Sequence, residues 1–228
     1  MNQKKPNRTQ TVVDALGRRI VSGEFAINVV FPSEPELERE YQVSRTVIRE
    51  AIKILSAKGL VTVRQRHGTH VNSREYWSWL DADLIRWLST STLAKQELLA
   101  FSEIRQIIEP EAAALAALRG DESQKQRIIE AYRRMAHNQE EESKAVAADK
   151  AFHLAILAAT GNPVLLSFQK VIEAIFDALF PYTTKAFADN IENHHQVAEA
   201  IYRGDAAAAR QNMKELLAET GRYIEKNT

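Results

Sequence analysis

An aspartate and a histidine in the second half of the 228-residue sequence have a spacing that suits metal chemistry. Asp149 and His153 are four residues apart, so on a helix they share one face. Such a pair can supply two ligands to one metal ion, and an ordinary hydrogen bond between the two side chains is the alternative. The same row continues to Ile156 and Leu157, which indicates that this face points inward.

A pair of histidines further along the chain offers a third candidate ligand. His194 lies on an apolar stripe of its helix, whereas His195 is flanked by glutamates and is expected to face solvent. A buried histidine is most often a hydrogen-bonded core residue. His194 is also a candidate to join Asp149 and His153 from a facing helix.

Arg105 is the remaining polar residue in an apolar setting, because its helix is rich in Ile, Leu and Ala. One interpretation is an ion pair with Glu109, one helical turn later. The other is a bidentate contact between the Arg105 guanidinium and the carboxylate of a small ligand. The sequence leaves both open.

Helices must position these residues, because apolar residues recur at helical spacing from about residue 80 onward and no strand alternation appears. Glycine, proline and short polar stretches separate the periodic segments. We therefore expect an antiparallel bundle of six or seven helices, whose core is a common place for small-molecule and metal sites. The segments are 80–90, 95–119, 123–141, 143–160, 163–181, 187–203 and 205–225.

The first 72 residues follow a different pattern, which predicts a winged helix-turn-helix. An opening helix is expected at 9–22. Ser33 and Glu36 have the spacing of a capping box at the start of the next helix. Ser44 begins a further helix that stops at Gly59. Short strands on either side of a turn at 64–68 would form the wing.

Basic and hydroxyl side chains gather where such a fold meets duplex DNA. A recognition helix presents its N-terminal residues to base edges, and arginine can bond a guanine bidentately. A solvated helix with scattered arginines is the alternative, but the basic turn of the wing coincides with the basic first turn of the helix. The candidate DNA-binding residues are Ser44, Arg45, Thr46, Arg49, Arg64, Arg66, His67 and Gly68.

Charge divides the chain in the same way. Residues 1–75 carry 13 Lys and Arg against 8 Asp and Glu, whereas residues 76–228 carry 17 against 22. The basic part is the one with the DNA-binding pattern. We expect a DNA-binding domain at 1–72, a hinge at 73–79 that tryptophans pack against the second domain, and an all-helical domain at 80–228 for effector binding and dimerisation.

Composition excludes several classes of protein. The sequence has no cysteine, which rules out disulfides, thiol catalysis and cysteine-based zinc fingers. No run of about 18 apolar residues is present. The polar N-terminus does not resemble a signal peptide. A cytoplasmic protein without a membrane partner is the simplest expectation.

The first domain resembles the GntR family of bacterial transcription regulators. In that family the positions of Ser44, Arg45, Thr46, Arg49 and the wing residues 66–68 touch DNA. Pro35 departs from the pattern, because some relatives have a DNA-reading arginine there. The resemblance is carried by Pro32-Ser33-Glu34, Val43-Ser44-Arg45-Thr46, Val47-x-Arg49-Glu50-Ala51-Ile52, Leu55, Gly59-Leu60 and Gly68-Thr69-x-Val71.

The second domain resembles the ligand-binding domain of the FadR branch of this family. The resemblance implies that an aspartate and three histidines hold a divalent metal, zinc or nickel, and that a carboxylate-bearing effector binds there. Asp149, His153 and His194 match the first three ligands. Leu216 stands where the fourth histidine falls, and Asn212 lies one turn before it. The matching runs are Glu103-x-Arg105-x-x-x-Glu109, Asp149-x-x-x-His153, Gly161-Asn162-Pro163-x-Leu165 and His194-x-x-Val197-x-x-Ala200-Ile201-x-x-Gly204-Asp205.

Sugar-acid-responsive repressors of this branch share two further features with the chain. These are the missing last histidine and the run Trp77-x-x-Leu80-Asp81-x-Asp83-x-x-x-Trp87. The likeness implies an aldonate or similar sugar acid as effector, with Arg105, Asp149, His153, His194 and Asn212 as candidate effector-binding residues.

The resulting hypothesis is a bacterial transcription regulator, more specifically a repressor, and not an enzyme. It would bind a palindromic operator in double-stranded DNA as a homodimer, under the control of a small carboxylate. One alternative is a metal-responsive regulator that uses Asp149, His153 and His194. Another is a metal-dependent enzyme fused to a DNA-binding domain.

Overall fold

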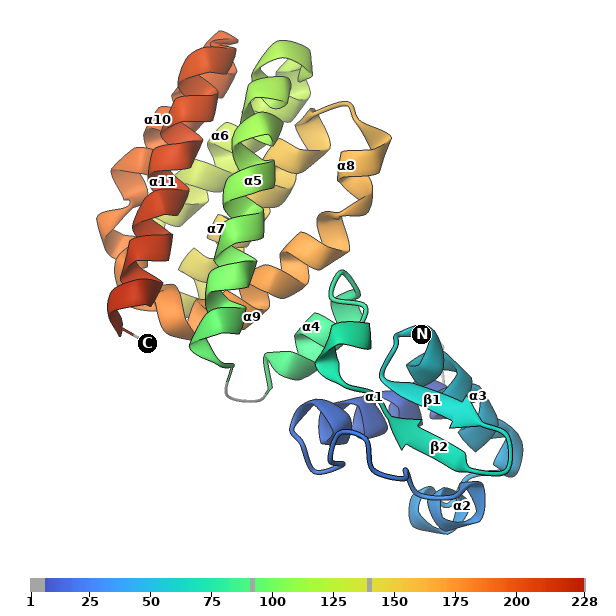
Figure 1. Ribbon diagram of the computed structural model, residues 1–228. Helices are drawn as coiled ribbons and strands as arrows, with labels where there is room; N and C mark the ends of the chain where they lie inside the picture. Colours follow the sequence, from blue (N-terminus) through green and yellow to red (C-terminus); the bar gives the residue numbers. More distant parts are fainter. Residues whose placement is uncertain (1–6, 91–92, 139–140, 228) are drawn as a thin grey trace. The chain divides into compact units, whose positions relative to one another are not determined.

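The computed structural model describes residues 7–90, 93–138 and 141–227 (Figure 1). The chain forms two compact units, Met1–Thr92 and Leu93–Thr228. Helices dominate both, and the strands of the described residues pair in one small sheet. The predicted fold class, mainly α with an N-terminal winged helix-turn-helix and a C-terminal helical bundle, is confirmed.

The N-terminal unit is a small helical core with a two-stranded wing. Leu16, Leu37, Ile48 and Leu55 are fully buried between its first three helices. The strands pair antiparallel from Val61 opposite Val71 to the turn. The elements are α1 (Arg8–Val21), α2 (Glu34–Tyr41), α3 (Arg45–Ala57), β1 (Val61–Arg64), β2 (Gly68–Val71), a 3-10 helix (Arg74–Tyr76) and α4 (Ala82–Leu88).

The expected start and stop residues set the ends of α2 and α3. The Ser33 backbone N–H donates to Glu36 Oε2 at 2.8 Å, and Ser33 Oγ donates to the same oxygen at 2.6 Å. Ser44 is the N-cap residue of α3. Gly59 adopts a φ of 76° just after α3 and turns the chain into β1. The helix-turn-helix prediction therefore holds in its local detail.

Helix α4 belongs to the N-terminal unit, which differs from the expected boundary. The hinge was expected at 73–79, and the tryptophans at 77, 79 and 87 were expected to pack it against the second domain. Instead, the fully buried Trp87 lies against Gly17 of α1, and its indole Nε1 donates to Asp14 Oδ1 at 3.0 Å. Helix α4 therefore packs as part of the N-terminal unit, although the second domain was expected to begin at residue 80.

Lys58 at the end of α3 also binds α4. Its ammonium donates to Asp81 Oδ2 at 2.7 Å and to Asp83 Oδ2 at 2.8 Å, and only 12% of its side chain is exposed. Burial lowers the pKa of Lys58, but the hydrogen bonds to both aspartates outweigh burial, so the pKa is raised overall. Asp81 in turn caps α4 through the backbone N–H groups of Asp83 and Leu84.

Replacing Lys58 with methionine is expected to destabilise the N-terminal unit by about 1–3 kcal/mol, because two half-buried carboxylates would lose their shared cation. All three tryptophans, at positions 77, 79 and 87, lie in this unit, so tryptophan fluorescence during urea unfolding reports on it alone. Lys53→Met is the matched control. Lys53 pairs with Glu50 in solvent, so its loss should change stability by less than about 0.5 kcal/mol. Equal effects of the two changes would contradict the prediction.

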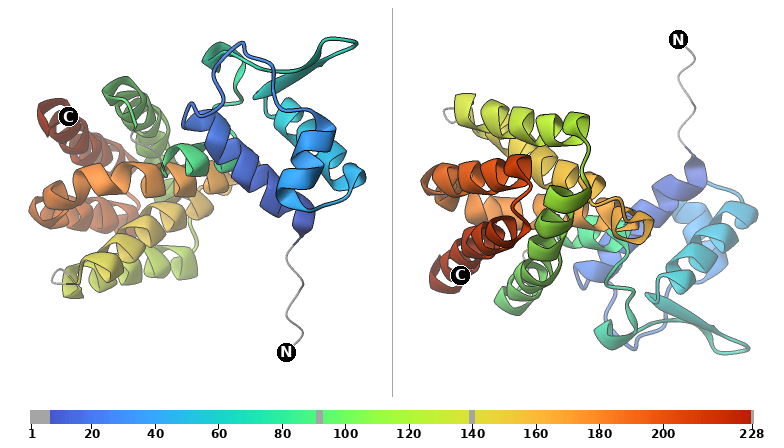
Figure 2. Two further views of the ribbon diagram at one scale, coloured as in Figure 1. Left: turned by 90° about the horizontal axis from the view of Figure 1, so that it is seen from below. Right: turned by 90° about the horizontal axis from the view of Figure 1, so that it is seen from above.

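The C-terminal unit is an antiparallel helical bundle. Helix α5 packs along α11, α6 along α7, and α10 against α11 (Figures 1 and 2). The buried alanines of α5, among them Ala113 and Ala116, let neighbouring helices approach closely. The elements are α5 (Lys95–Arg119), α6 (Glu122–His137), α7 (Glu142–Ala159), α8 (Pro163–Ser167), α9 (Gln169–Asp189), α10 (Ile191–Arg203) and α11 (Ala206–Asn227).

One predicted helix boundary in this unit is wrong. A single helix was expected at 163–181, ending at Pro181. The structure has a break at Phe168, and α9 then continues through Pro181 to Asp189. Proline removes one backbone hydrogen bond from a helix, but packing on both sides can hold the helix together. The breaks predicted at Gly120, Gly161 and Gly204 are confirmed.

None of the helices that the structure describes combines the length and apolar character needed to cross a membrane.

Candidate functional site

The polar residues singled out in the bundle meet around one small cavity. Arg105 comes from α5, Asp149 and His153 from α7, and His194 from α10. Arg105, His153 and His194 are each at most 5% exposed. The cavity measures about 40 Å³, which is room for about three water molecules at roughly 10–15 Å³ each. Most of the remaining lining is apolar and includes Phe176.

Asp149 lies between the two histidines. Its Oδ1 is 3.4 Å from His153 Nε2 and 3.0 Å from His194 Nε2. Burial raises the pKa of Asp149, but the hydrogen bonds with His153 and His194 outweigh burial and hold the pKa far below its usual value. The carboxylate is therefore ionised and can accept a hydrogen bond from either ring or bind a metal ion.

The hydrogen bond of His194 to the backbone fixes the orientation of its ring. Nδ1 lies 2.7 Å from the Asn190 carbonyl oxygen, which can only accept, so Nδ1 carries hydrogen. Nε2 then points at Asp149. Metal-binding histidines commonly donate their other ring N–H to a carbonyl or carboxylate in this way. The ligand atoms of Asp149, His153 and His194 all lie within 4.8 Å of one another.

Glu109 forms the second half of the cluster, behind the cavity wall. Its Oε1 accepts from Arg105 Nε at 2.6 Å, and its Oε2 is 2.5 Å from His153 Nδ1. The expected Arg105–Glu109 ion pair is therefore present, and Arg105 lines the cavity as well. The guanidinium also lies 3.9 Å from the centre of the Phe176 ring.

Opposing effects set the pKa values of this pair. Burial raises the pKa of Glu109, but Arg105 and His153 outweigh burial and lower the pKa to about 2. Burial lowers the pKa of His153, but the charge of Glu109 and the hydrogen bonds with Asp149 and Glu109 raise it overall. Two carboxylates and two cationic groups thus share a site that is nearly closed to water.

The last two candidate residues on α11 have different positions. Leu216, which stands where the family has its fourth histidine, is buried and lines the cavity. Asn212 does not reach this cavity, and its amide donates to the Gln196 carbonyl oxygen at 3.0 Å. Asn212 lies one helical turn before Leu216 and bonds to α10, so the structure separates it from the other candidate effector-binding residues.

The structure adds residues to the site that the sequence analysis did not identify. Phe176, Leu179, Phe180 and Thr183 of α9 line the cavity. In the sequence they form an ordinary apolar helix face with one threonine, so nothing distinguishes them from core residues. Glu109 was recognised as a partner of Arg105 but not of His153, since residues 44 positions apart give no local pattern.

The candidate DNA-binding residues of α3 lie together on an exposed surface. Arg45, Thr46 and Arg49 are exposed, and Ser44 precedes them at the helix start. Arg45 Nε donates to Glu34 Oε2 at 2.8 Å, and Arg49 Nε lies 3.5 Å from Glu34 Oε1. Glu34 of α2 thus holds both guanidinium groups beside the start of α3.

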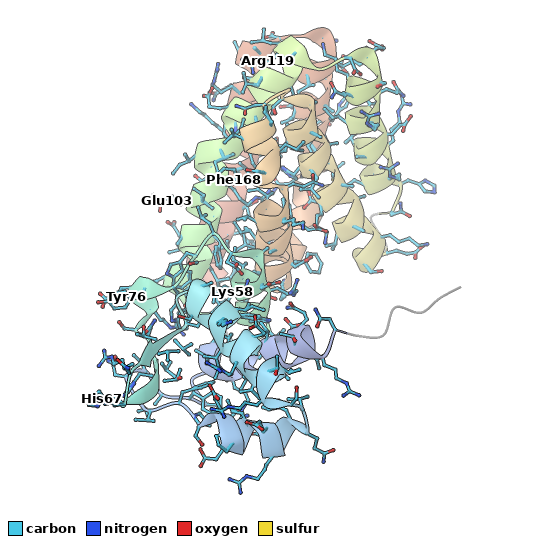
Figure 3. All side chains as sticks on the ribbon, turned by 90° about the vertical axis from the view of Figure 1, so that its right-hand side faces the viewer. Lys58, His67, Tyr76, Glu103, Arg119 and Phe168 are labelled. Carbon is cyan, nitrogen blue, oxygen red and sulfur yellow. The ribbon has the colours of Figure 1, made fainter. Side chains whose placement is uncertain are left out.

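The wing carries the remaining candidates. Arg64, Arg66, His67 and Gly68 are all exposed, and Figure 3 shows His67 at the end of the hairpin. Arg66 and Gly68 adopt φ values of 66° and 80°, which produce the tight turn between the strands. The backbone at Gly68 carries no side chain and is open to close approach.

Two domain matches account for the two groups of residues. Residues 8–71 match the domain described as bacterial regulatory proteins, gntR family, and residues 100–219 match the FCD domain. The chain belongs to the GntR family. The FCD domain places this GntR-family protein in the FadR branch, as the resemblance implied. It is a DNA-binding transcription regulator with an effector-binding domain.

Relatives of this GntR-family regulator are similar over most of their length. The galactonate operon transcriptional repressor of Escherichia coli (strain K12) is 30% identical over 97% of this chain and 99% of that protein. The uncharacterized HTH-type transcriptional regulator YieP of the same organism is 32% identical over 92% and 93%. Because the named relatives are transcription regulators, this GntR-family chain is a regulator and not an enzyme.

A solved structure supports the fold of this GntR-family protein. Lar, described as controlling the expression of the Listeria monocytogenes agr system, covers the whole of both chains with a TM-score of 0.69 and 20% identity.

Proposed function

We propose that this regulator is a repressor that binds a palindromic operator as a homodimer and that a small sugar acid weakens this binding. Similarity to a named galactonate operon repressor along nearly the whole chain carries the proposal. The buried Arg105 beside the cavity supports it, because a guanidinium is the side chain best suited to a carboxylate.

In the N-terminal unit, α3 would enter the major groove. Arg45, Thr46 and Arg49 would meet base edges and phosphates, with Ser44 at the helix start. The wing would lie along the backbone, where Arg64, Arg66 and His67 face phosphates and Gly68 permits close approach. The exposure of these residues supports this arrangement.

Replacing Arg45 with alanine is expected to weaken operator binding about 10- to 100-fold, the effect of losing one bidentate arginine–base contact. Fluorescence anisotropy with a labelled operator fragment measures the affinity. Arg133→Ala is the control, because it removes the same charge from an exposed position on α6. If both variants lose affinity equally, net charge rather than a contact at α3 determines binding.

In the C-terminal unit, the sugar acid would place its carboxylate on Arg105. Its hydroxyl groups would then lie near Asp149, His153 and His194, which offer acceptors and donors. The cavity of about 40 Å³ is far smaller than a six-carbon acid, so the bundle has to open for the ligand. Effector binding would thereby favour a dimer conformation with low operator affinity.

The same residues fit a divalent metal ion. Two ligand atoms around tetrahedral zinc, with bonds of about 2.0 Å, lie roughly 3.3 Å apart. The separations of Asp149 Oδ1 from His153 Nε2 and His194 Nε2, 3.4 and 3.0 Å, are close to that value. A bound ion would supply positive charge and open coordination positions to a carboxylate ligand. With Leu216 in place of a fourth ligand, we propose weak zinc or nickel binding.

A metal-responsive regulator is the second candidate, because Asp149, His153 and His194 form a metal-type cluster. Leu216 argues against it, since a sensor governed by metal alone benefits from a complete ligand set. The candidates differ in whether metal without sugar acid changes operator affinity.

The test is an anisotropy titration of a duplex from upstream of the protein's own gene, at fixed salt, with a panel of sugar acids. Each acid is tested with and without a chelator. We expect one acid to lower operator affinity about 5- to 150-fold, the usual range of allosteric coupling. No effect of any acid would overturn the proposal, and an equal effect of zinc alone would favour the metal-responsive regulator. Sedimentation should give the mass of two 25.8 kDa chains.

A further inference from the structure

Glu109 has an unusual position for a glutamate, because it is only 4% exposed and does not line the cavity. Each of its oxygens meets a different cationic group. Oε1 accepts from Arg105 at 2.6 Å, and Oε2 lies 2.5 Å from His153 Nδ1. One carboxylate therefore touches both groups that face the cavity from this side.

The contact with Glu109 fixes the ring of His153. An ionised carboxylate only accepts hydrogen bonds, and a lone pair on Nδ1 would repel it at 2.5 Å, so the hydrogen belongs on Nδ1 although the angle of this contact falls outside that of a hydrogen bond. Nε2 is thereby directed to the cavity side, where it lies 3.4 Å from Asp149 Oδ1 and 3.5 Å from Arg105 Nη2. A ring held in this way keeps its Nδ1–H toward Glu109 and can offer the Nε2 lone pair to a metal ion that binds beside Asp149.

The contact with Glu109 also fixes the guanidinium of Arg105. Nε and Nη2 both lie within reach of the carboxylate, at 2.6 and 3.4 Å, and Phe176 covers the flat face of the group. Arg105 and His153 would repel each other at their separation of 3.5 Å without a shared anion. Because the Glu109 carboxylate is bound to both, the two cations can lie side by side on one wall of the cavity.

We propose that Glu109 is a positioning residue that orients Arg105 and His153 together. Binding of an anion by Arg105 and ligand binding by His153 beside Asp149 are thereby coupled. The proposal rests on the proposed effector site. A purely structural ion pair would need no second contact with His153. The coupling predicts that a change at Glu109 alters ligand binding although Glu109 touches no ligand.

Glu109→Gln tests the proposal, because it keeps the shape of the side chain while its amide can donate to His153 Nδ1. Glu111→Gln is the control on the same helix, since Glu111 pairs with Arg210 at the surface. The first measurement is the ring ¹⁵N spectrum of histidine-labelled, chelator-treated protein at a pH where His153 is neutral, with the His153 signals identified by a His153→Gln variant. We expect hydrogen on Nδ1 in the native protein and in Glu111→Gln, and on Nε2 in Glu109→Gln.

The second measurement is the concentration of sugar acid that releases half of the operator DNA. Glu109→Gln should raise this concentration about 10- to 100-fold, as substitutions behind ligand-binding groups usually do, and Glu111→Gln should leave it within about twofold. An unchanged His153 spectrum, or an unchanged response to sugar acid, would overturn the proposal. If no acid releases DNA from the native protein, the proposed function fails, while the spectrum still decides whether Glu109 orients His153.

Discussion

Alanine at position 59 is expected to unfold the N-terminal unit at temperatures where the native chain is folded. Gly59 has a φ of 76°, and a Cβ atom on it would lie 1.9 Å from the Tyr76 carbonyl oxygen. Because that oxygen belongs to the backbone, the segment before α4 would have to move away from α3. We expect a loss of at least about 4 kcal/mol, a large part of the stability of a typical domain.

Gly23→Ala separates the clash from backbone strain. Gly23 has a similar φ of 82°, but no atom lies within 4 Å of the Cβ position. This control should lose only roughly 1–2 kcal/mol, the cost of the left-handed conformation for a residue with a side chain. Urea unfolding followed by tryptophan fluorescence measures both variants. Equal losses would mean that the contact between Gly59 and Tyr76 does not constrain the fold.

Arg105→Met should destabilise the C-terminal unit by about 3–5 kcal/mol near neutral pH, because it leaves the Glu109 carboxylate buried without its guanidinium. Circular dichroism follows unfolding of the helices, and tryptophan fluorescence of the N-terminal unit should stay unchanged. The double variant Arg105→Met/Glu109→Leu should recover most of the lost stability, since two apolar side chains replace the pair. Its response to sugar acid should still be absent.

The double variant makes the result decisive. If stability recovers but the response to sugar acid does not, Arg105 binds the ligand, and the instability of Arg105→Met comes from the unpaired Glu109 carboxylate. If the double variant is as unstable as Arg105→Met, packing around Phe176, and not an unpaired charge, explains the loss.

Local chemistry made much of the fold predictable. Ser33 and Glu36 form the expected capping contacts, and Gly59 ends α3 as its type and position indicate. Such features depend on a few neighbouring residues, so the sequence contains all the information. The inward direction of His153 and His194 followed in the same way from helical periodicity.

Contacts between distant residues were harder to predict. The pairing of Lys58 with Asp83 and the burial of Trp87 against α1 assign α4 to the N-terminal unit, yet residues 80–90 alone look like any amphipathic helix. The Glu109–His153 contact joins two helices whose relative rotation no local pattern specifies. Asn212 lies one turn from Leu216 as its spacing indicates, but its amide bonds to the Gln196 carbonyl oxygen and it does not line the cavity.

Pro181 has a consequence for how fast the regulator can respond. It lies within α9 among the cavity-lining residues Leu179, Phe180 and Thr183, where the backbone lacks one hydrogen bond. Deformation of this wall therefore costs less than elsewhere along the helix. If the ligand can enter the cavity only after this wall deforms, the observed rate of association levels off as ligand concentration rises. Dissociation is slow for the same reason. The promoter would then respond to sustained supplies of the compound and average out brief ones.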